Sequence, residues 1–437
     1  MVENNKTFTE RSKKYFIFMM IVLALVQIMD AYTTSYTAAF PSKVIQEFLV
    51  IPYGINETTA QALMQIIIAI ATIGTFFVFF NQFLSDKFGR KTMLFVTTLG
   101  MGLSALLLAL SVNIILYTIF LFSTYLFFSS DMWLIYAGEE APPTKKALYT
   151  NYLLACGILG PIMMPLLRSV FITESSPVWA WRGMTLLPIL LGIPLSFVIF
   201  FTIKETKIYE MGKLSGEIDK SQIFLVDNVK KLFQSSQKKP LKALVLMSFF
   251  AGLNFNLLQL AESFLATNTT LTEKDVNLVI TLIAVSVILG YLITGVLADK
   301  IGRIPLLYVT TILVPVASVL LYIGSLITSN VFIVVALAVS LAYVGYNGIL
   351  IVIRIMVTEL VPTEKRGTGL GVRSFSTSFG ITGGFLIGSL ITILVGDLGI
   401  SFIILSLPTL INLYLIPKFI PETKGTDLSE VELRLKQ

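Results

Sequence analysis

The strongest constraint in this sequence is its series of long apolar runs, such as Tyr15–Met29, Ala62–Phe80 and Val331–Ile353. A helix needs about 20 mainly apolar residues to cross the hydrocarbon core of a bilayer. The runs lack the alternation of apolar and polar residues that marks the strands of a membrane barrel. Of the 437 residues, 55% are hydrophobic and only 13% are charged, whereas roughly a quarter are charged in a soluble domain. The sequence therefore predicts an all-α integral membrane protein.

Turn signals between the apolar runs predict twelve membrane-spanning helices. Lys and Arg gather in every second connection, which the positive-inside rule assigns to the cytoplasm. The other connections hold few cations, mainly Lys43, Arg182 and Lys274. We therefore expect a multi-pass protein of the cytoplasmic (plasma) membrane with both termini in the cytoplasm. The predicted spans are 15–41, 58–84, 92–111, 114–138, 147–171, 179–203, 241–266, 275–298, 305–328, 331–357, 367–395 and 399–420.

Three short patterns occur once in each half of the chain. Asp86 and Arg90 return as Asp299 and Arg303, Glu139-Pro142-Lys146 returns as Glu359-Pro362-Arg366, and Glu205-Thr-Lys returns as Glu422-Thr-Lys. The repeat predicts two pseudo-symmetric halves of six helices each. The expected parts are an N-terminal half (1–203), a cytoplasmic linker (204–240), a C-terminal half (241–421) and a cytoplasmic tail (422–437). Within the linker, residues 223–233 predict either an amphipathic helix on the inner leaflet or a flexible segment.

Residue content limits the chemistry. The chain has no His, so His-based metal sites, Ser-His-Asp hydrolysis and a His proton relay are excluded, and proton transfer must use carboxylates. Cys156 is the single cysteine, which excludes an intrachain disulfide. No nucleotide-binding loop, metal cluster or nucleophile–base pair is found in the sequence, and we expect no enzyme activity, cofactor or metal. The net charge of +6 lies mostly in short connections and does not indicate a nucleic-acid partner.

The loop sequences Asn81–Arg90 and Gly295–Arg303 join apolar spans at equivalent places in the two halves. With Glu359–Gly371 and Pro421–Gly425, they resemble the major facilitator superfamily over nearly the whole chain, in the branch of sugar porters and metabolite:proton symporters. The resemblance implies a charged cytoplasmic gate that locks the halves together when the protein opens outward and breaks when it opens inward; the alternative is ordinary surface loop charges. The gate positions are Asp86, Arg90, Glu139, Lys146, Glu205, Asp299, Arg303, Glu359, Arg366 and Glu422.

The sequence departs from the sugar-porter pattern at two places. Gly252-Leu-Asn254 is present, but Ser248 and Phe249 stand where sugar porters carry a Gln pair. Leu153 and Leu154 replace a polar pair in the fifth span. Without these polar groups a hexose would lose the hydrogen bonds that make its recognition specific. We therefore place an organic acid or other metabolite ahead of a sugar.

Three acidic residues lie well inside predicted spans, away from the span ends. An ionisable group at bilayer depth is costly unless it is paired or hydrated, so its presence indicates function. Burial favours the protonated form of a carboxyl group, which lets it carry a proton. Asp30 and Asp131 are the leading proton-coupling candidates, because the resemblance implies that the first and fourth spans line a central cavity. Asp131 could instead pair with Arg354, and Glu262, the third candidate, could be a hydrated rim residue.

Polar and aromatic residues in the spans that the resemblance assigns to the cavity are the candidate substrate ligands. In the first span, spacings of three and four place Gln27, Asp30 and Thr34 on one helical face. Arg354 suits a carboxylate or phosphate ligand, or else belongs to the cytoplasmic gate. The full set is Gln27, Asp30, Thr34, Asp131, Trp133, Asn254, Asn256, Gln259, Tyr346, Asn347 and Arg354.

Together these features predict a secondary active transporter that moves a small polar organic solute by alternating access, with proton symport. The alternatives are a proton-coupled antiporter of drugs or organic cations, an uncoupled facilitator, and a nutrient sensor with the transporter fold. The expected partners are the solute, protons and membrane lipids, and the resemblance implies a monomer.

Overall fold

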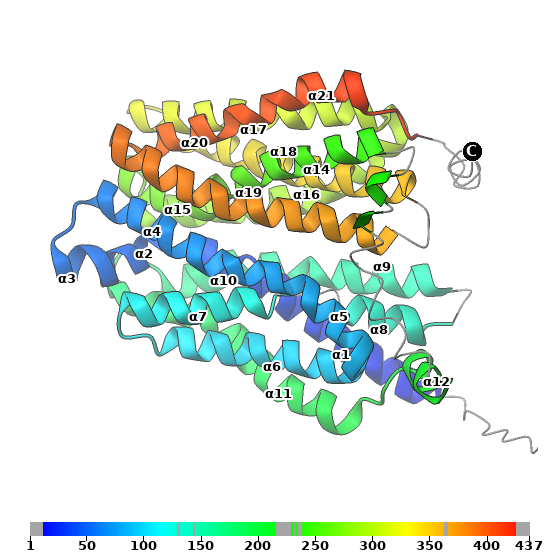
Figure 1. The fold of residues 1–437 in the computed structure, drawn as a ribbon. Helices are drawn as coiled ribbons and strands as arrows, with labels where there is room; N and C mark the ends of the chain where they lie inside the picture. The colour runs from blue at the N-terminus through cyan, green and yellow to red at the C-terminus, as the bar shows by residue number, and fades with distance from the viewer. Residues whose placement is uncertain are drawn as a thin grey trace, which may run out of the picture.

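The computed structural model describes residues 12–128, 132–142, 145–215, 229–230, 232–234, 238–361 and 366–424, and these residues are almost entirely helical. Figure 1 shows two helix bundles side by side, an N-terminal bundle from blue to green and a C-terminal bundle from green to red. The order of elements along the chain matches the two six-helix halves expected from the repeated patterns.

Each bundle contains both single helices and broken ones. The N-terminal bundle comprises α1 (Lys13–Thr33), α2 (Pro41–Ile45), α3 (Ile51–Tyr53), α4 (Glu57–Thr72), α5 (Val78–Phe88), α6 (Arg90–Ala109), α7 (Ile114–Leu126), α8 (Met132–Glu140), α9 (Lys146–Gly157), α10 (Leu159–Phe171) and α11 (Leu186–Thr202). The C-terminal bundle comprises α14 (Lys238–Leu253), α15 (Phe255–Asn268), α16 (Glu273–Ile301), α17 (Arg303–Leu326), α18 (Val331–Leu360), α19 (Arg366–Val395), α20 (Leu398–Ser406) and α21 (Asn412–Phe419).

The prediction of a many-span membrane protein is confirmed. In the described part of the chain, eleven helical segments are long and apolar enough to cross a bilayer. The twelfth expected span, the fourth, consists of the shorter apolar helix α7 and the helix α8 on either side of residues 129–131. Asp131 is among those three residues and lies outside the described part of the chain.

The first span is shorter than its predicted range of 15–41. Helix α1 ends at Thr33, and a 3₁₀ turn (Tyr36–Ala39) and α2 follow. The hydroxyl groups of Thr33 and Thr34 donate to the carbonyls of Met29 and Ala31. Such side-chain bonds compete with the backbone hydrogen bonds of the helix. Pro41 has no backbone N–H to donate to the preceding turn, so α1 cannot continue through it. Thr34 is therefore a C-cap residue, and the helical face predicted for it ends one residue earlier.

The second and seventh spans also contain breaks. The second passes through a 3₁₀ segment at Ile73–Phe77, where a side chain on Gly74 would clash with the backbone of the fourth span at 2.7 Å. The seventh is divided at Asn254 into α14 and α15. The Asn254 amide donates to the carbonyl of Phe250 at 2.9 Å and to Thr409 Oγ1 at 2.7 Å, which ties the break to the twelfth span.

The two ends of the molecule differ in their elements. We name them the loop-motif end, which contains the turns at Gly89 and Gly302, and the Glu262 end, which contains α2, α3 and the start of α16. Both the beginning of α1 and the end of α21 lie at the loop-motif end, on the right in Figure 1. The short helix α12 (Lys207–Ser215) lies at the same end. Most of the expected linker helix, residues 223–233, lies outside the described part of the chain.

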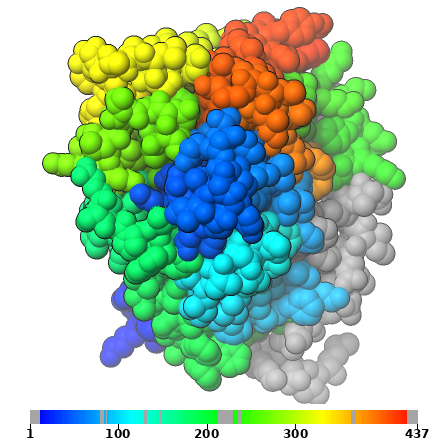
Figure 2. Space-filling model, turned by 90° about the vertical axis from the view of Figure 1, so that its left-hand side faces the viewer, coloured from blue at the N-terminus to red at the C-terminus, as the bar shows by residue number. Residues whose placement is uncertain are grey.

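Hydrophobic packing joins the two bundles toward the Glu262 end. One buried cluster contains Tyr36 and Phe40 of the N-terminal half together with Phe264 and Phe402 of the C-terminal half. A second cluster, which includes Met19 and residues 132–137, consists of N-terminal residues only. Viewed from the Glu262 end, the dark-blue segment that contains α2 and α3 covers the middle of the face between the two halves (Figure 2). Core packing therefore closes this end.

We predict that Gly302→Ala destabilises the protein by about 1–3 kcal/mol, the typical cost of placing a side chain in this sparsely populated backbone region. Gly302 has φ 100° and ψ 166°, and a Cβ there would lie 2.7 Å from a Glu422 carboxylate oxygen. The matched control is Gly295→Ala, because nothing lies within 4 Å of a Cβ at that position. Thermal unfolding of the purified variants checks this; equal melting temperatures for the two would contradict it.

Candidate functional site

The loop-motif end carries the same charged arrangement in both halves. In the C-terminal half, the Glu422 carboxylate accepts hydrogen bonds from the backbone N–H groups of Arg303 (3.0 Å) and Ile304 (2.9 Å) at the start of α17. In the N-terminal half, Glu205 accepts from the N–H of Lys91 at 3.1 Å, at the start of α6. The free N–H groups and positive dipole of a helix N-terminus favour a carboxylate there.

Each half also has a buried or half-buried Arg–Glu pair beside this carboxylate. Arg303 pairs with Glu359 at 2.7 Å and donates to the Ala298 carbonyl at 2.9 Å. Arg90 pairs with Glu139 and donates to the Ser85 carbonyl, each at 2.9 Å. The second oxygen of each glutamate accepts from a threonine hydroxyl, Thr423 in one half and Thr206 in the other. The repeat read from the sequence is therefore a repeat of bonded geometry.

These charges act inside each half. Among the described residues, every ion pair at the loop-motif end joins residues of the same half. Asp299 pairs with Arg303 at 3.2 Å but is 78% exposed, and Lys146 is exposed at the start of α9. Asp86 and Arg366 stand in α5 and α19, with side chains outside the described part. None of these described ion pairs therefore joins the two halves, as a closed gate at this end would require.

Burial would raise the pKa of the Glu422 carboxyl, but backbone N–H groups outweigh it. The N–H groups of Ile304, Arg303, Lys424 and Thr423 all donate to this carboxylate and hold its pKa below the ordinary value. Because the folded protein binds the charged form more strongly, Glu422 stabilises the fold above its ordinary pKa. That stabilisation is lost as the pH falls through the lowered value.

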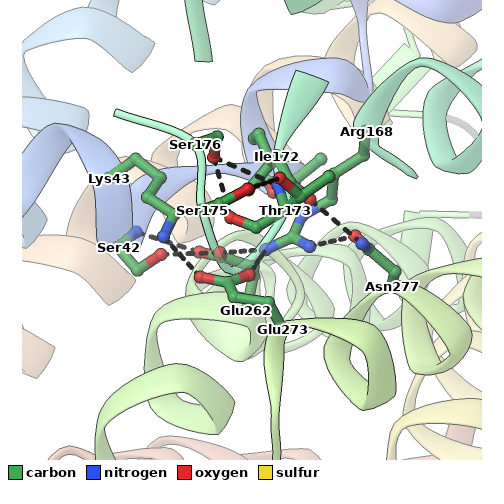
Figure 3. A network of polar contacts seen from close by, with 11 residues as sticks. Ser42, Lys43, Arg168, Ile172, Thr173, Ser175, Ser176, Glu262, Glu273 and Asn277 are labelled. Carbon is green, nitrogen blue, oxygen red and sulfur yellow. Dashed lines mark hydrogen bonds and ion pairs between the residues drawn. The ribbon is translucent and has the colours of Figure 1, made fainter. Parts of the chain in front are cut away.

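At the Glu262 end, an ion pair crosses the boundary between the halves. Arg168 of α10 is fully buried and its guanidinium lies 2.7 Å from the carboxylate of Glu262 in α15, which is 1% exposed. Glu262 also accepts from the Ser42 backbone N–H at 2.9 Å and from the Ser42 hydroxyl at 2.6 Å. Figure 3 shows Arg168 reaching between Glu262 and Asn277, with Ser42 on the other side of the carboxylate.

Three further side chains complete this cluster. Arg168 lies 3.2 Å from Glu273 and also donates to Asn277. Glu273 pairs with Lys43 of α2. The alternative in which Glu262 is a hydrated rim residue does not hold in this structure, because its carboxylate is enclosed by Arg168 and Ser42.

Further polar side chains join α15 across the boundary to the 3₁₀ turn Tyr36–Ala39 and to α4. The Gln259 amide donates to Thr37 Oγ1 at 2.9 Å, and the Asn256 amide donates to Gln65 Oε1 at 2.7 Å. Both Asn256 and Gln65 are fully buried. In this conformation Asn256 and Gln259 of α15 therefore contact the N-terminal half.

The candidates of the first, fourth and seventh spans lie in different surroundings. Asp30 and Gln27 are buried in α1, and a side chain on Gly157 would lie 2.3 Å from the Gln27 amide nitrogen. Trp133 is buried in the N-terminal apolar cluster, which is a packing position. Asn254 holds the break between α14 and α15.

In the tenth span, the candidates lie on α18. Tyr346 is buried beside the ring of Phe255, with ring centroids 6.0 Å apart. The Asn347 amide donates to the Tyr343 carbonyl at 2.9 Å. Arg354 is exposed and forms no ion pair with any described residue, and Glu359 is bonded to Arg303 instead. Arg354 is therefore separate from the described gate charges.

Sequence reasoning did not single out Arg168, Gln61 or Gln65. Arg168 carried a usable signal, because it is a charged residue inside the predicted span 147–171. Gln61 and Gln65 are four residues apart on α4, and Gln61 donates to Thr267 Oγ1 at 2.6 Å. A polar stripe inside an apolar run indicates a helix contact of this kind.

Known proteins resemble this chain in sequence and in its two-bundle fold. The sequence profile described as Major Facilitator Superfamily matches residues 15–232 and 244–435. The chain belongs to this superfamily. It is a multi-pass membrane transporter, and its relatives are transporters rather than enzymes.

One relative is the provisionally named metabolite transport protein YwtG of Bacillus subtilis (strain 168), 26% identical over 400 residues, which are 81% of this chain and 82% of YwtG. Among solved structures, a crystal structure of a D-xylose-proton symporter matches with a TM-score of 0.75 and 19% identity, covering 94% of this chain and 99% of the other. The inward-open xylose transporter XylE from E. coli matches with a TM-score of 0.72 and 19% identity, covering 96% and 99%. At this identity the solved structures support the fold.

For Glu422→Gln we predict a lower melting temperature at about neutral pH and a difference from the parent that shrinks toward about pH 3, because protonation removes the same charge from the parent. Melting curves over this pH range check it. Glu174→Gln is the matched control, because Glu174 lies exposed in the loop after α10 and we expect no change with pH. A Glu422→Gln difference that stays constant as the pH falls would contradict the assigned role.

Proposed function

We propose that this protein is a proton-coupled symporter of the cytoplasmic membrane that moves a small polar organic solute. The superfamily membership supports transport by alternating access between two bundles. The names of its relatives, a metabolite transport protein and a D-xylose-proton symporter, favour a metabolite or sugar over a lipophilic drug. Beyond membership of the superfamily, this proposal therefore adds the class of solute and the coupling to protons.

The loop-motif end is assigned to the cytoplasm. Lys87, Lys91, Lys145, Lys204 and Lys207 all lie at this end, as the positive-inside rule favours for cytoplasmic connections. Because the described chain begins and ends there, both termini are assigned to the cytoplasm too. The conformation is then inward-facing, with its outer end closed by the cluster around Glu262.

The observation that carries proton coupling is the burial of Asp30 in the interior of the N-terminal half. Asp30 is 5% exposed, and α1 packs backbone to backbone against the fifth span around it. A Cβ on Gly160 would lie 2.6 Å from the backbone nitrogen of Tyr32 and 2.7 Å from the carbonyl oxygen of Ile28. Because a change in water access changes the proton affinity of a carboxyl group, proton binding and release can accompany the change between conformations. Asp131 is assigned the same role, and Glu262 is third because its carboxylate holds an ion pair.

Several polar groups support a solute with hydrogen-bonding or acidic groups. Asn256 and Gln259 carry amides on the face of α15 that meets the N-terminal half. Arg354 presents an exposed guanidinium on α18, which can bind a carboxylate through two parallel hydrogen bonds. An organic acid or other metabolite fits this set, and a sugar comes next.

The test is solute-driven proton flux into liposomes that contain the purified protein, with sugars, carboxylates, amino acids and cationic dyes as solutes. We expect the parent to move protons with one solute class, and Asp30→Asn to lower that flux at least about tenfold, because an amide cannot carry the proton. Asp397→Asn is the matched control, since Asp397 caps α20 through Ile400 N–H and Asn caps a helix equally well.

Two results would contradict the proposal. Solute uptake by the parent without any proton movement would identify a facilitator. Proton release driven only by cationic dyes would identify an antiporter.

A further inference from the structure

The four charged side chains of the cluster around Glu262 are sorted by half. Lys43 and Arg168, both cations, belong to the N-terminal half, whereas Glu262 and Glu273, both anions, belong to the C-terminal half. The cluster thus contains two positive and two negative charges only when the halves meet. This sorting makes the contact between the halves electrostatically complementary.

Most bonds in the cluster cross the boundary. Arg168 keeps one bond inside its own half, from Nε to the Ala39 carbonyl at 2.6 Å. Its contacts with Glu262, Glu273 and Asn277 all cross, as do those between Ser42 and Glu262. Asn277 also donates back across the boundary to the Ile172 carbonyl at 3.1 Å. Separation of the halves at this end would therefore remove these bonds together.

The burial of the central pair makes this an all-or-none contact. Arg168 is 0% exposed and Glu262 is 1% exposed. A buried charge that loses its partner is strongly unfavourable, whereas a hydrated charge is not. The pair is therefore stable in two situations, either bonded with the end closed or hydrated with the end open. Intermediate separations leave two charges without partners or water.

We propose that the Arg168–Glu262 pair is the lock of the outer end and sets the balance between the inward-facing and outward-facing conformations of this transporter. Arg168 acts as a positioning residue, because it holds Glu262, and through it α15, against α2. The loop-motif charges do not share this role in the inward-facing state, since their described ion pairs stay within each half. The proposal rests on alternating access and is independent of which solute or ion is carried.

The test measures the distance between spin labels on the two halves at this end. Ile115 and Leu326 suit this, being 68% and 65% exposed at the start of α7 and at the end of α17. The labels are attached to Ile115→Cys and Leu326→Cys in a Cys156→Ser background, because Cys156 is the only native cysteine. Electron–electron double resonance without solute then reports the populations of closed and open outer ends.

We expect Arg168→Gln and Glu262→Gln each to raise the ratio of long to short distances at least about tenfold over the parent. The exchanged double variant, Arg168→Glu with Glu262→Arg, should return part of the short-distance population by restoring the pair. Arg182→Gln is the matched control, because Arg182 pairs with Glu47 at 2.7 Å at the same end but inside one half. It should leave the distances unchanged.

Unchanged distances in both single variants would overturn the proposal, as would an equal shift in Arg182→Gln. If either single variant fails to fold, Glu273→Gln provides the same test more mildly. This variant removes the charge of the second carboxylate that Arg168 contacts, and Glu273 is 18% exposed. We therefore expect a smaller increase in the long-distance population. Because solute and proton gradient are absent, the result does not depend on the proposed coupling.

Discussion

The conformation depends on a buried ion pair whose two partners belong to different halves of the chain. Neither half can complete this pair by itself, because Arg168 is on α10 and Glu262 is on α15. Removing one partner from a buried pair costs about 3–5 kcal/mol. The surrounding apolar cluster, which contains residues of both halves, excludes the water that could replace the missing partner. Apolar packing and charge pairing at this end therefore form and separate together.

The charges of the loop-motif end serve the opposite purpose, because they stabilise each half by itself. Glu205 and Glu422 cap the starts of α6 and α17, and each cap requires a glycine with positive φ at the turn before it. The paired Arg–Glu contacts then join three separate segments of the same half. A half held together in this way can move as one body, since its internal bonds survive when the contacts between the halves are exchanged.

The sequence predicts local features well and long-range contacts poorly. Span length and the repeated loop patterns predicted the two bundles, and the glycine turns follow from the same patterns. The fourth span and the end of the first were less regular than their apolar content suggests. In the first span, the hydroxyl groups of Thr33 and Thr34 compete for backbone carbonyls. Glu262 was a candidate in the right span, but its partner lies 94 positions away. No spacing rule relates residues of two different halves, so their pairing emerges only from the fold.

Helix α15 connects closure of the outer end with the proposed binding of solute. Its buried polar face bonds to the N-terminal half through Asn256, Gln259 and Glu262. The break at Asn254 separates α15 from α14, and the Asn254 amide ties this break to the twelfth span through Thr409. Amides that bond to Gln65 and Thr37 are occupied while the end is closed. A solute that binds these amides from the outside must therefore compete with the closing contacts or replace them with its own, and either way its binding changes the energy of closure.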